Sequence, residues 1–251
     1  MMWSELILLF VIGIFGGFIS GLVGIGGAII IYPALILIPP LLGYPVMTAY
    51  VASGLTSAQV FFSTLSGAFS ARKKDAFSLQ LVLYMGGGML IGSSLGAIVA
   101  HLINADFVTY VYIGVAMLAL VLLFFKVTPR HETPTFHRLL LVLIGGSVGI
   151  VSGIVGAGGA FIITPILLAV FKLPMNTVVA NSIVIAFISS IGTFVTKAFQ
   201  GYIPLDLACA IVLGSIIFAP IGLHVGRHIP STVQKGIISL LIILAITQLI
   251  F

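Results

Sequence analysis

Six glycines in two matching stretches are the residues of this sequence best suited to bind a solute. One stretch, SGLVGIGGAIIIYP, runs from Ser20 to Pro33, and the other, SGIVGAGGAFIITP, runs from Ser152 to Pro165, with ten of fourteen positions identical. Glycine adopts backbone conformations closed to other residues, so Gly-Gly pairs inside apolar segments predict a helix break. The N–H groups that start the next helix carry partial positive charge and attract anions. We expect an anion site formed by Gly24, Gly26, Gly27, Gly156, Gly158 and Gly159.

Helix packing is the alternative explanation for these glycines, because small residues let transmembrane helices approach closely. Two features favour the binding site. Glycines one and three residues apart, such as Gly24, Gly26 and Gly27, do not lie on one packing face of a helix. The proline that follows each motif, Pro33 or Pro165, also recurs at the same offset.

Polar side chains gather in the third apolar segment of each half of the chain. They are Thr48, Ser53, Thr56, Ser57 and Gln59 in the first half and Asn176, Thr177, Asn181 and Ser182 in the second. Hydrogen bonds between helices would explain the hydroxyl groups. An amide facing lipid is costly, so Gln59 and Asn181 must face protein or a cavity. We expect Ser53, Asn181 and Ser182 to contact the substrate.

No acidic side chain lies in the interior of an apolar segment. The five acids lie at segment ends or in loops, at Glu5, Asp75, Asp106, Glu132 and Asp206. A sodium site or proton relay within the membrane usually needs such a carboxylate, so cation transport is disfavoured. His224 lies near a segment end, where a structural role is favoured over proton coupling. A single cysteine, Cys209, and the lack of a metal-ligand cluster or nucleophile–base pair predict no metal, no cofactor and no enzyme activity.

The elements that position these residues are membrane helices. The chain has 251 residues, of which 61% are hydrophobic and 6% charged, with a mean hydropathy of +1.35; a soluble domain carries about 25% charged residues. We therefore predict an all-α polytopic protein of the cell membrane. The ten apolar segments are expected at about 5–24, 28–43, 47–70, 77–101, 107–126, 139–157, 159–171, 174–197, 205–226 and 232–251.

The segments divide into two repeats of five, predicted at 1–130 and 131–251, with a cytoplasmic connector at about 127–138. Matches beyond the glycine motifs pair Pro45, Thr48, Ser53, Gly88 and Gly96 with Pro174, Thr177, Ser182, Gly214 and Gly222. Segments 28–43 and 159–171 are short for a crossing, which suggests half-helices. Each repeat then has a broken or re-entrant first element and three further transmembrane helices, about eight membrane elements in all.

Basic residues predict that the second repeat is inverted relative to the first. The net charge of +5 comes from clustered Lys and Arg, a pattern that reports orientation and does not indicate nucleic-acid binding. Arg72–Lys74 and Lys126–Arg138 mark cytoplasmic loops, whereas the second-half turn with Arg227 and Lys235 corresponds to the acidic Asp106 turn of the first half. Both termini are then outside. Lys197 is the exception, because this scheme places it near the outside.

The duplicated glycine element, the Asn181–Ser182 pair and the paired glycines at 88/96 and 214/222 resemble the TauE/SafE sulfite exporter family. The resemblance covers almost the whole chain. It implies export of sulfite or of organosulfonates such as sulfoacetate, and some relatives are linked to thiosulfate. One departure is that the first half has Ala52–Ser53 where the second has Asn181–Ser182, so the two half-sites differ.

We therefore expect a secondary transporter that exports small sulfur-containing anions, bound near the bilayer midplane by broken-helix N-termini. An inside-negative membrane potential favours anion exit. An importer of thiosulfate-type anions and an anion channel are the alternatives. The expected partners are the anion and the lipid bilayer, with no nucleic acid, and a homodimer is left open.

Overall fold

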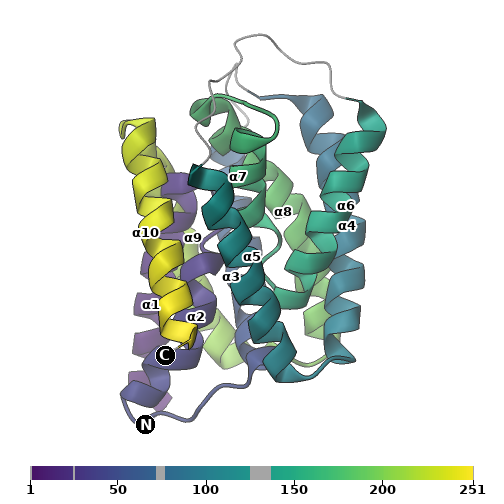
Figure 1. The fold of residues 1–251 in the computed structure, drawn as a ribbon. Helices are drawn as coiled ribbons and strands as arrows, with labels where there is room; N and C mark the ends of the chain where they lie inside the picture. Colours follow the sequence, from purple (N-terminus) through teal and green to yellow (C-terminus); the bar gives the residue numbers. More distant parts are fainter. Residues whose placement is uncertain (1, 25, 72–76, 125–136, 251) are drawn as a thin grey trace.

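Ten helices make up the described part of the protein, and it contains no strand. The structure is a computed structural model that describes residues 2–24, 26–71, 77–124 and 137–250 (Figure 1). The helices are α1 (Met2–Val23), α2 (Ala28–Leu41), α3 (Ala49–Ala71), α4 (Leu79–His101), α5 (Ala105–Phe124), α6 (Arg138–Val155), α7 (Ala160–Ala169), α8 (Met175–Phe199), α9 (Leu205–Gly226) and α10 (Ser231–Ile250).

Six of these helices are long and apolar enough to cross a membrane, namely α1, α4, α5, α6, α8 and α9. The expectation of an all-helical, multi-pass membrane protein is confirmed. A short helix follows each glycine motif, with 14 residues in α2 and 10 in α7. Helix α3 has 23 residues but is less apolar, and its polar side chains from Ser53 to Thr64 are buried in the protein. Neighbouring helices thus shield these groups from lipid, where an unpaired polar group would be costly.

Two glycine-rich helix pairs hold the bundle together, and we call them the packing seams. Helix α4 packs most extensively on α6, and α1 on α9. Along α4, a methyl group added at Gly88, Gly92 or Gly96 would lie within 2.5 Å of a backbone carbonyl oxygen of α6. Along α1, Gly13, Gly17 and Gly21 meet the α9 backbone in the same way. Small residues at four-residue spacing let these backbones touch, as in other membrane helix pairs.

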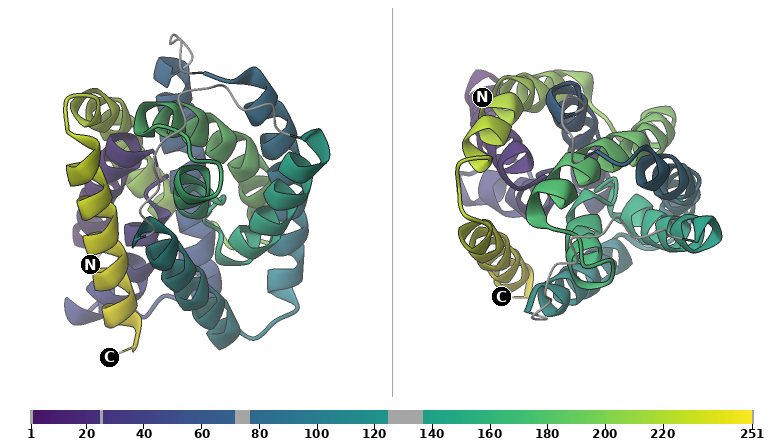
Figure 2. Two further views of the ribbon diagram at one scale, coloured as in Figure 1. Left: turned by 45° about the horizontal axis from the view of Figure 1, so that its top comes forward. Right: turned by 90° about the horizontal axis from the view of Figure 1, so that it is seen from above.

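The least exposed helices lie in the middle of the bundle. Of the candidate spans, α8 is the most buried, with 67% of its most apolar 18-residue stretch buried in the protein. Helix α7 lies near the centre when the molecule is seen from above (Figure 2), and its residues Phe161–Leu168 are all buried. Both glycine motifs therefore lead into helices that adjoin the protein interior.

The helices begin at different ends of the bundle. The chain termini and the start of α1 lie at the lower end of the molecule, whereas α6 and α10 begin at the upper end (Figure 1).

Candidate functional site

The six motif glycines interrupt the helices where the sequence predicts breaks. All six have positive φ, from 59° at Gly158 to 82° at Gly156. Helix α1 ends at Val23 and α2 begins at Ala28, while α6 ends at Val155 and α7 begins at Ala160. A side chain at these positions would be strained, because L-residues rarely adopt such φ values. The glycines are therefore required by the backbone conformation itself.

Each break ends at a glycine that caps the next helix. Gly27 caps α2 and Gly159 caps α7, and neither N-terminus has a hydrogen bond from a capping side chain. The Gly27 carbonyl accepts from the N–H groups of Ile30 and Ile31 at 3.1 and 3.2 Å, and Gly159 repeats the pattern with Ile162 and Ile163. The earlier N–H groups of each helix have no partner within the helix. Both ends thus carry the partial positive charge of a helix N-terminus.

The starts of α2 and α7 both lie next to residues 59 and 60 of α3. A methyl group added at Gly27 would lie 3.2 Å from Nε2 of Gln59. One added at Gly158 would lie 3.2 Å from Cγ1 of Val60, the next residue along α3. The N-termini of α2 and α7, which come from different halves of the chain, therefore approach the same turn of α3.

Tyr112 of α5 bridges the same two helix starts. Its hydroxyl donates a 2.6 Å hydrogen bond to the carbonyl of Ile29, the second residue of α2. Its ring lies 6.0 Å from the ring of Phe161, the second residue of α7. Tyr112 is fully buried and also stacks on Tyr32 at 4.9 Å. Ile29 and Phe161 occupy matching positions in the two motifs, so Tyr112 holds equivalent points of the two breaks together.

The two predicted serines each contact the break of the opposite half. Ser182 of α8 donates a 2.9 Å hydrogen bond from its hydroxyl to the Gly24 carbonyl. Ser53 of α3 lies against Gly156, where an added methyl group would be 2.4 Å from its Oγ. The repeat-matched serines thus face repeat-matched glycines across the molecule. Only the Ser182 contact is a hydrogen bond, because Ser53 Oγ has no partner among the described residues.

Gln59 is a candidate site residue that the sequence does not separate from its polar neighbours. Its side chain is fully buried, and neither Nε2 nor Oε1 has a hydrogen-bond partner among the described residues. Leaving a buried polar group unpaired costs about 1–3 kcal/mol. Gln59 also adjoins Gly27 at the start of α2. Its amide and the Ser53 hydroxyl are therefore available to a bound solute.

Asn181, the other expected contact, is already engaged in the protein. Its Oδ1 accepts a 2.8 Å hydrogen bond from the backbone N–H of Ser78, and its Nδ2 donates to the Thr177 carbonyl at 2.7 Å. These bonds tie α8 to the residue that caps α4. A substrate contact of Asn181 stays a prediction, but the structure gives its amide another role.

Ionisable groups are scarce around the breaks. Among the described residues no group of three His, Cys, Asp or Glu side chains could hold a metal ion. Glu5, Asp106 and Asp206 lie in the first turns of their helices. His224 is exposed near the end of α9, and the structural role favoured for it stays a prediction. Arg72–Lys74 and most of the 127–138 connector fall outside the described residues.

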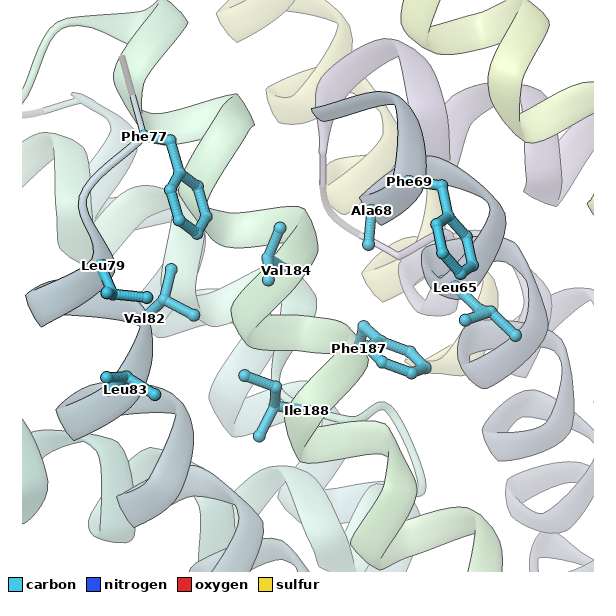
Figure 3. Close-up of a pocket in the computed structure, with 10 residues that line it drawn as sticks. All are labelled: Leu65, Ala68, Phe69, Phe77, Leu79, Val82, Leu83, Val184, Phe187 and Ile188. Atoms are coloured by element: carbon cyan, nitrogen blue, oxygen red, sulfur yellow. The ribbon is translucent and has the colours of Figure 1, made fainter. Parts of the chain in front are cut away.

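An apolar crevice of about 350 Å³ lies between α3, α4 and α8. Figure 3 shows the lining side chains, among them Ala68 of α3, Val82 of α4 and Phe187 of α8, facing a common space. Every lining residue is hydrophobic. The crevice offers no donor to an anion and is distinct from the glycine breaks.

Broken helices packed inside a bundle of membrane spans are typical of secondary membrane transporters, and comparison with known proteins agrees. The profile of the sulfite exporter TauE/SafE family matches residues 9–249. The chain belongs to this family.

Curated relatives are named only as transporters. The probable membrane transporter protein YunE of Bacillus subtilis (strain 168) is 26% identical, over 98% of each chain. YjnA of the same organism, named likewise, is 28% identical over 92% of this chain and 94% of its own. MJ0441 of Methanocaldococcus jannaschii is 25% identical over 88% of this chain and 86% of its own. The search of solved structures found no significant match.

Proposed function

We propose that the protein exports small sulfur-containing oxyanions, sulfite or organosulfonates such as sulfoacetate, across the cell membrane. The observation that carries the proposal is the approach of two helix N-termini, neither with a capping side chain, to the turn of α3 that holds Gln59. Sulfite and sulfonate each present three oxygens that can accept several N–H and O–H donors at once. The family description, sulfite exporter TauE/SafE, supports the same class of substrate.

The binding site proposed for the anion consists of the six glycines with Ser53, Ser182 and Gln59. The glycines direct backbone N–H groups toward the solute, and Ser53 and Gln59 supply further donors. Ser182 shapes the site through its hydrogen bond to the Gly24 carbonyl. Such a site attracts an anion without a cationic side chain at the breaks. Asn181 would act indirectly, by positioning α8 next to the first break.

The proposed architecture is a pair of inverted repeats, residues 1–130 and 131–251, in the plasma membrane. Helix α1 begins at the lower end of the molecule and its counterpart α6 at the upper end, which supports inversion (Figure 1). Arg138 starts α6, and Arg227 and Lys235 flank the turn into α10. These helices begin at the upper end, which under the positive-inside rule supports a cytoplasmic position for that end. Both termini would then face outward.

The proposal is tested by thermal-shift measurements on the detergent-solubilised protein. The panel includes sulfite, sulfoacetate, thiosulfate, acetate and sodium chloride, because a ligand that binds the folded state raises its Tm. Sulfite or sulfoacetate should raise Tm, and acetate and sodium should not. A protein stabilised only by the carboxylate, or only by sodium, would contradict the assignment.

Transport direction and mechanism are measured with the protein in proteoliposomes. Saturable uptake with counterflow of sulfoacetate is expected of a transporter, whereas a channel shows neither. An inside-negative potential should accelerate exit of the anion, because it contributes a driving force of about 2.3 kcal/mol per charge per 100 mV. Thiosulfate accumulation against that potential would favour the importer instead.

A further inference from the structure

Lys197 is a buried cation that the glycine site does not use. It lies in the last turn of α8, inside a candidate membrane span, and its side chain is fully buried. Its Nζ has no hydrogen-bond partner among the described residues. The other basic residues that the structure describes, Arg138, Lys172, Arg227 and Lys235, are at least partly exposed. Lys197 therefore differs from them in both burial and position.

The described part of the chain supplies no counter-charge for this ammonium group. Glu5, Asp106 and Asp206 are all at least partly exposed, and none is paired with Lys197. Nζ lies over the Tyr202 ring, 5.9 Å from its centroid. Burying a charge without a partner costs several kcal/mol. An anion beside Nζ would remove that cost.

A layer of aromatic side chains lies next to Lys197. Tyr202 stacks on Tyr50 of α3 with ring centroids 5.2 Å apart. The Tyr202 hydroxyl lies 2.6 Å from Nδ1 of His101, and the Tyr50 hydroxyl donates to the Ile103 carbonyl. Contacts from α3, α4 and the turn after α8 thus join at this end of the bundle.

The repeat relates Lys197 to the apolar crevice, which is lined by the middle of α8. Ser53 and Ser182 are 129 residues apart, and the same offset pairs Ala68 with Lys197 and Gln59 with Ile188. Ala68 and Ile188 both line the crevice in Figure 3. The pseudo-twofold counterpart of that apolar crevice would therefore carry Gln59 and Lys197, two buried side chains with unpartnered polar atoms. The crevice is apolar, whereas its counterpart would hold a cation and an amide.

We propose that Lys197 is the anion-binding cation of a second substrate subsite, between the glycine breaks and the Tyr50–Tyr202 layer, on the outer side of the protein. This inference rests on the proposed function and assigns the subsite the same ligand class, a small sulfur-containing oxyanion. Nζ would pair with the oxyanion, and Gln59 would contact it from the side of the breaks. The Tyr50–Tyr202 layer closes the subsite toward the outside and must open for release.

Binding to charge variants tests the subsite. The full-length protein in nanodiscs is titrated with sulfoacetate as wild type, Lys197→Met, Lys197→Arg and the control Lys172→Met, which removes an exposed charge. Lys197→Met should weaken binding about 10- to 100-fold, the effect of losing a charged hydrogen bond. Lys197→Arg should retain most of the affinity, and Lys172→Met should match wild type.

The outcomes separate the two proposals. Wild-type protein that binds no sulfur oxyanion overturns the proposed function, whatever the variants do. Wild-type binding that is unchanged in Lys197→Met overturns the subsite alone. Equal weakening in Lys172→Met would also overturn it, because the effect would then come from net charge.

A second measurement does not depend on the fold of a Lys197 variant. Ala58 corresponds to the crevice residue Phe187 at the same offset, so Ala58→Cys in a Cys209→Ser background places a thiol on the proposed outer route. A membrane-impermeant maleimide added outside should label it, and saturating sulfoacetate should slow labelling several-fold. Absence of labelling from outside, or labelling that sulfoacetate leaves unchanged, would overturn the proposal.

Discussion

Glycines serve two different purposes in two regions of this protein. At the packing seams they are helical and remove volume, as at Gly96, where an added methyl group would lie 2.0 Å from the Ile150 carbonyl oxygen. At the breaks they supply a conformation, as at Gly158, where φ is +59° and the nearest atoms to an added methyl group are side-chain atoms at 3.0 and 3.2 Å. Gly27 and Gly156 do both, because an added methyl group there would also lie 2.4 and 2.3 Å from a backbone oxygen. Seam glycines therefore control folding, whereas break glycines such as Gly158 shape the space that we assign to the anion.

The largest effect is expected at a seam, from Gly96→Val. The added side chain would meet the α6 backbone, which cannot move without separating the two helices. We expect a loss of stability of at least about 3 kcal/mol, the upper part of the range for overpacking. Size-exclusion chromatography and thermal unfolding should show a poorly folded protein. A monodisperse variant with the wild-type Tm would contradict the distinction between the two regions.

The next largest effect is expected at a break, from Gly158→Val. A β-branched residue with positive φ should cost about 1–3 kcal/mol of stability, and its side chain would extend toward Ser190 and Val60. Sulfoacetate should no longer raise Tm.

Gly201→Val is the matched control for this experiment. Gly201 has φ +75° but no neighbouring atom within 4 Å of an added methyl group. It should therefore show similar strain with normal ligand-induced stabilisation. If both variants still respond to sulfoacetate, or if both lose the response, the break does not shape the site.

The sequence predicts the breaks well because their signals are local. Gly26–Gly27 and Gly158–Gly159 permit positive φ, and all four glycines adopt it. The Gly16–Gly17 and Gly145–Gly146 pairs stay helical, so the proline repeated at the same offset is needed to tell a break from a packing pair. The contact between Ser182 and Gly24 spans 158 residues, so it depends on which helices are neighbours, and composition does not reveal that.

The partners of the two buried amides and the burial of Lys197 also depend on tertiary packing. Gln59 and Asn181 are both amides in apolar segments, yet only Asn181 finds a backbone N–H, that of Ser78 on another element. Lys197 departs from the charge pattern along the chain, but its full burial follows from the packing around the end of α8. The sequence can indicate that such groups need partners, and the fold decides which of them obtain one.

The two break serines allow a finer comparison, beginning with Ser182→Ala. This change leaves the Gly24 carbonyl without the 2.9 Å hydrogen bond from Ser182. We expect a loss of about 1–3 kcal/mol, the cost of an unpaired buried polar group, measured as a lower Tm without ligand. An unchanged Tm would mean that the first break is held in place by other contacts.

The smallest effect on stability is expected from Ser53→Ala. Ser53 Oγ is buried and has no partner among the described residues, so its removal should leave the ligand-free Tm unchanged or slightly raised. If Oγ serves a bound oxyanion, affinity for sulfoacetate should fall by about 2- to 10-fold, equivalent to one hydrogen bond of about 0.5–1.5 kcal/mol. Paired measurements of ligand-free Tm and sulfoacetate affinity would then show opposite patterns for the two serines, with stability lost at Ser182 and affinity lost at Ser53. A Ser53→Ala protein with lower stability and normal affinity would assign this serine to helix packing and remove it from the site.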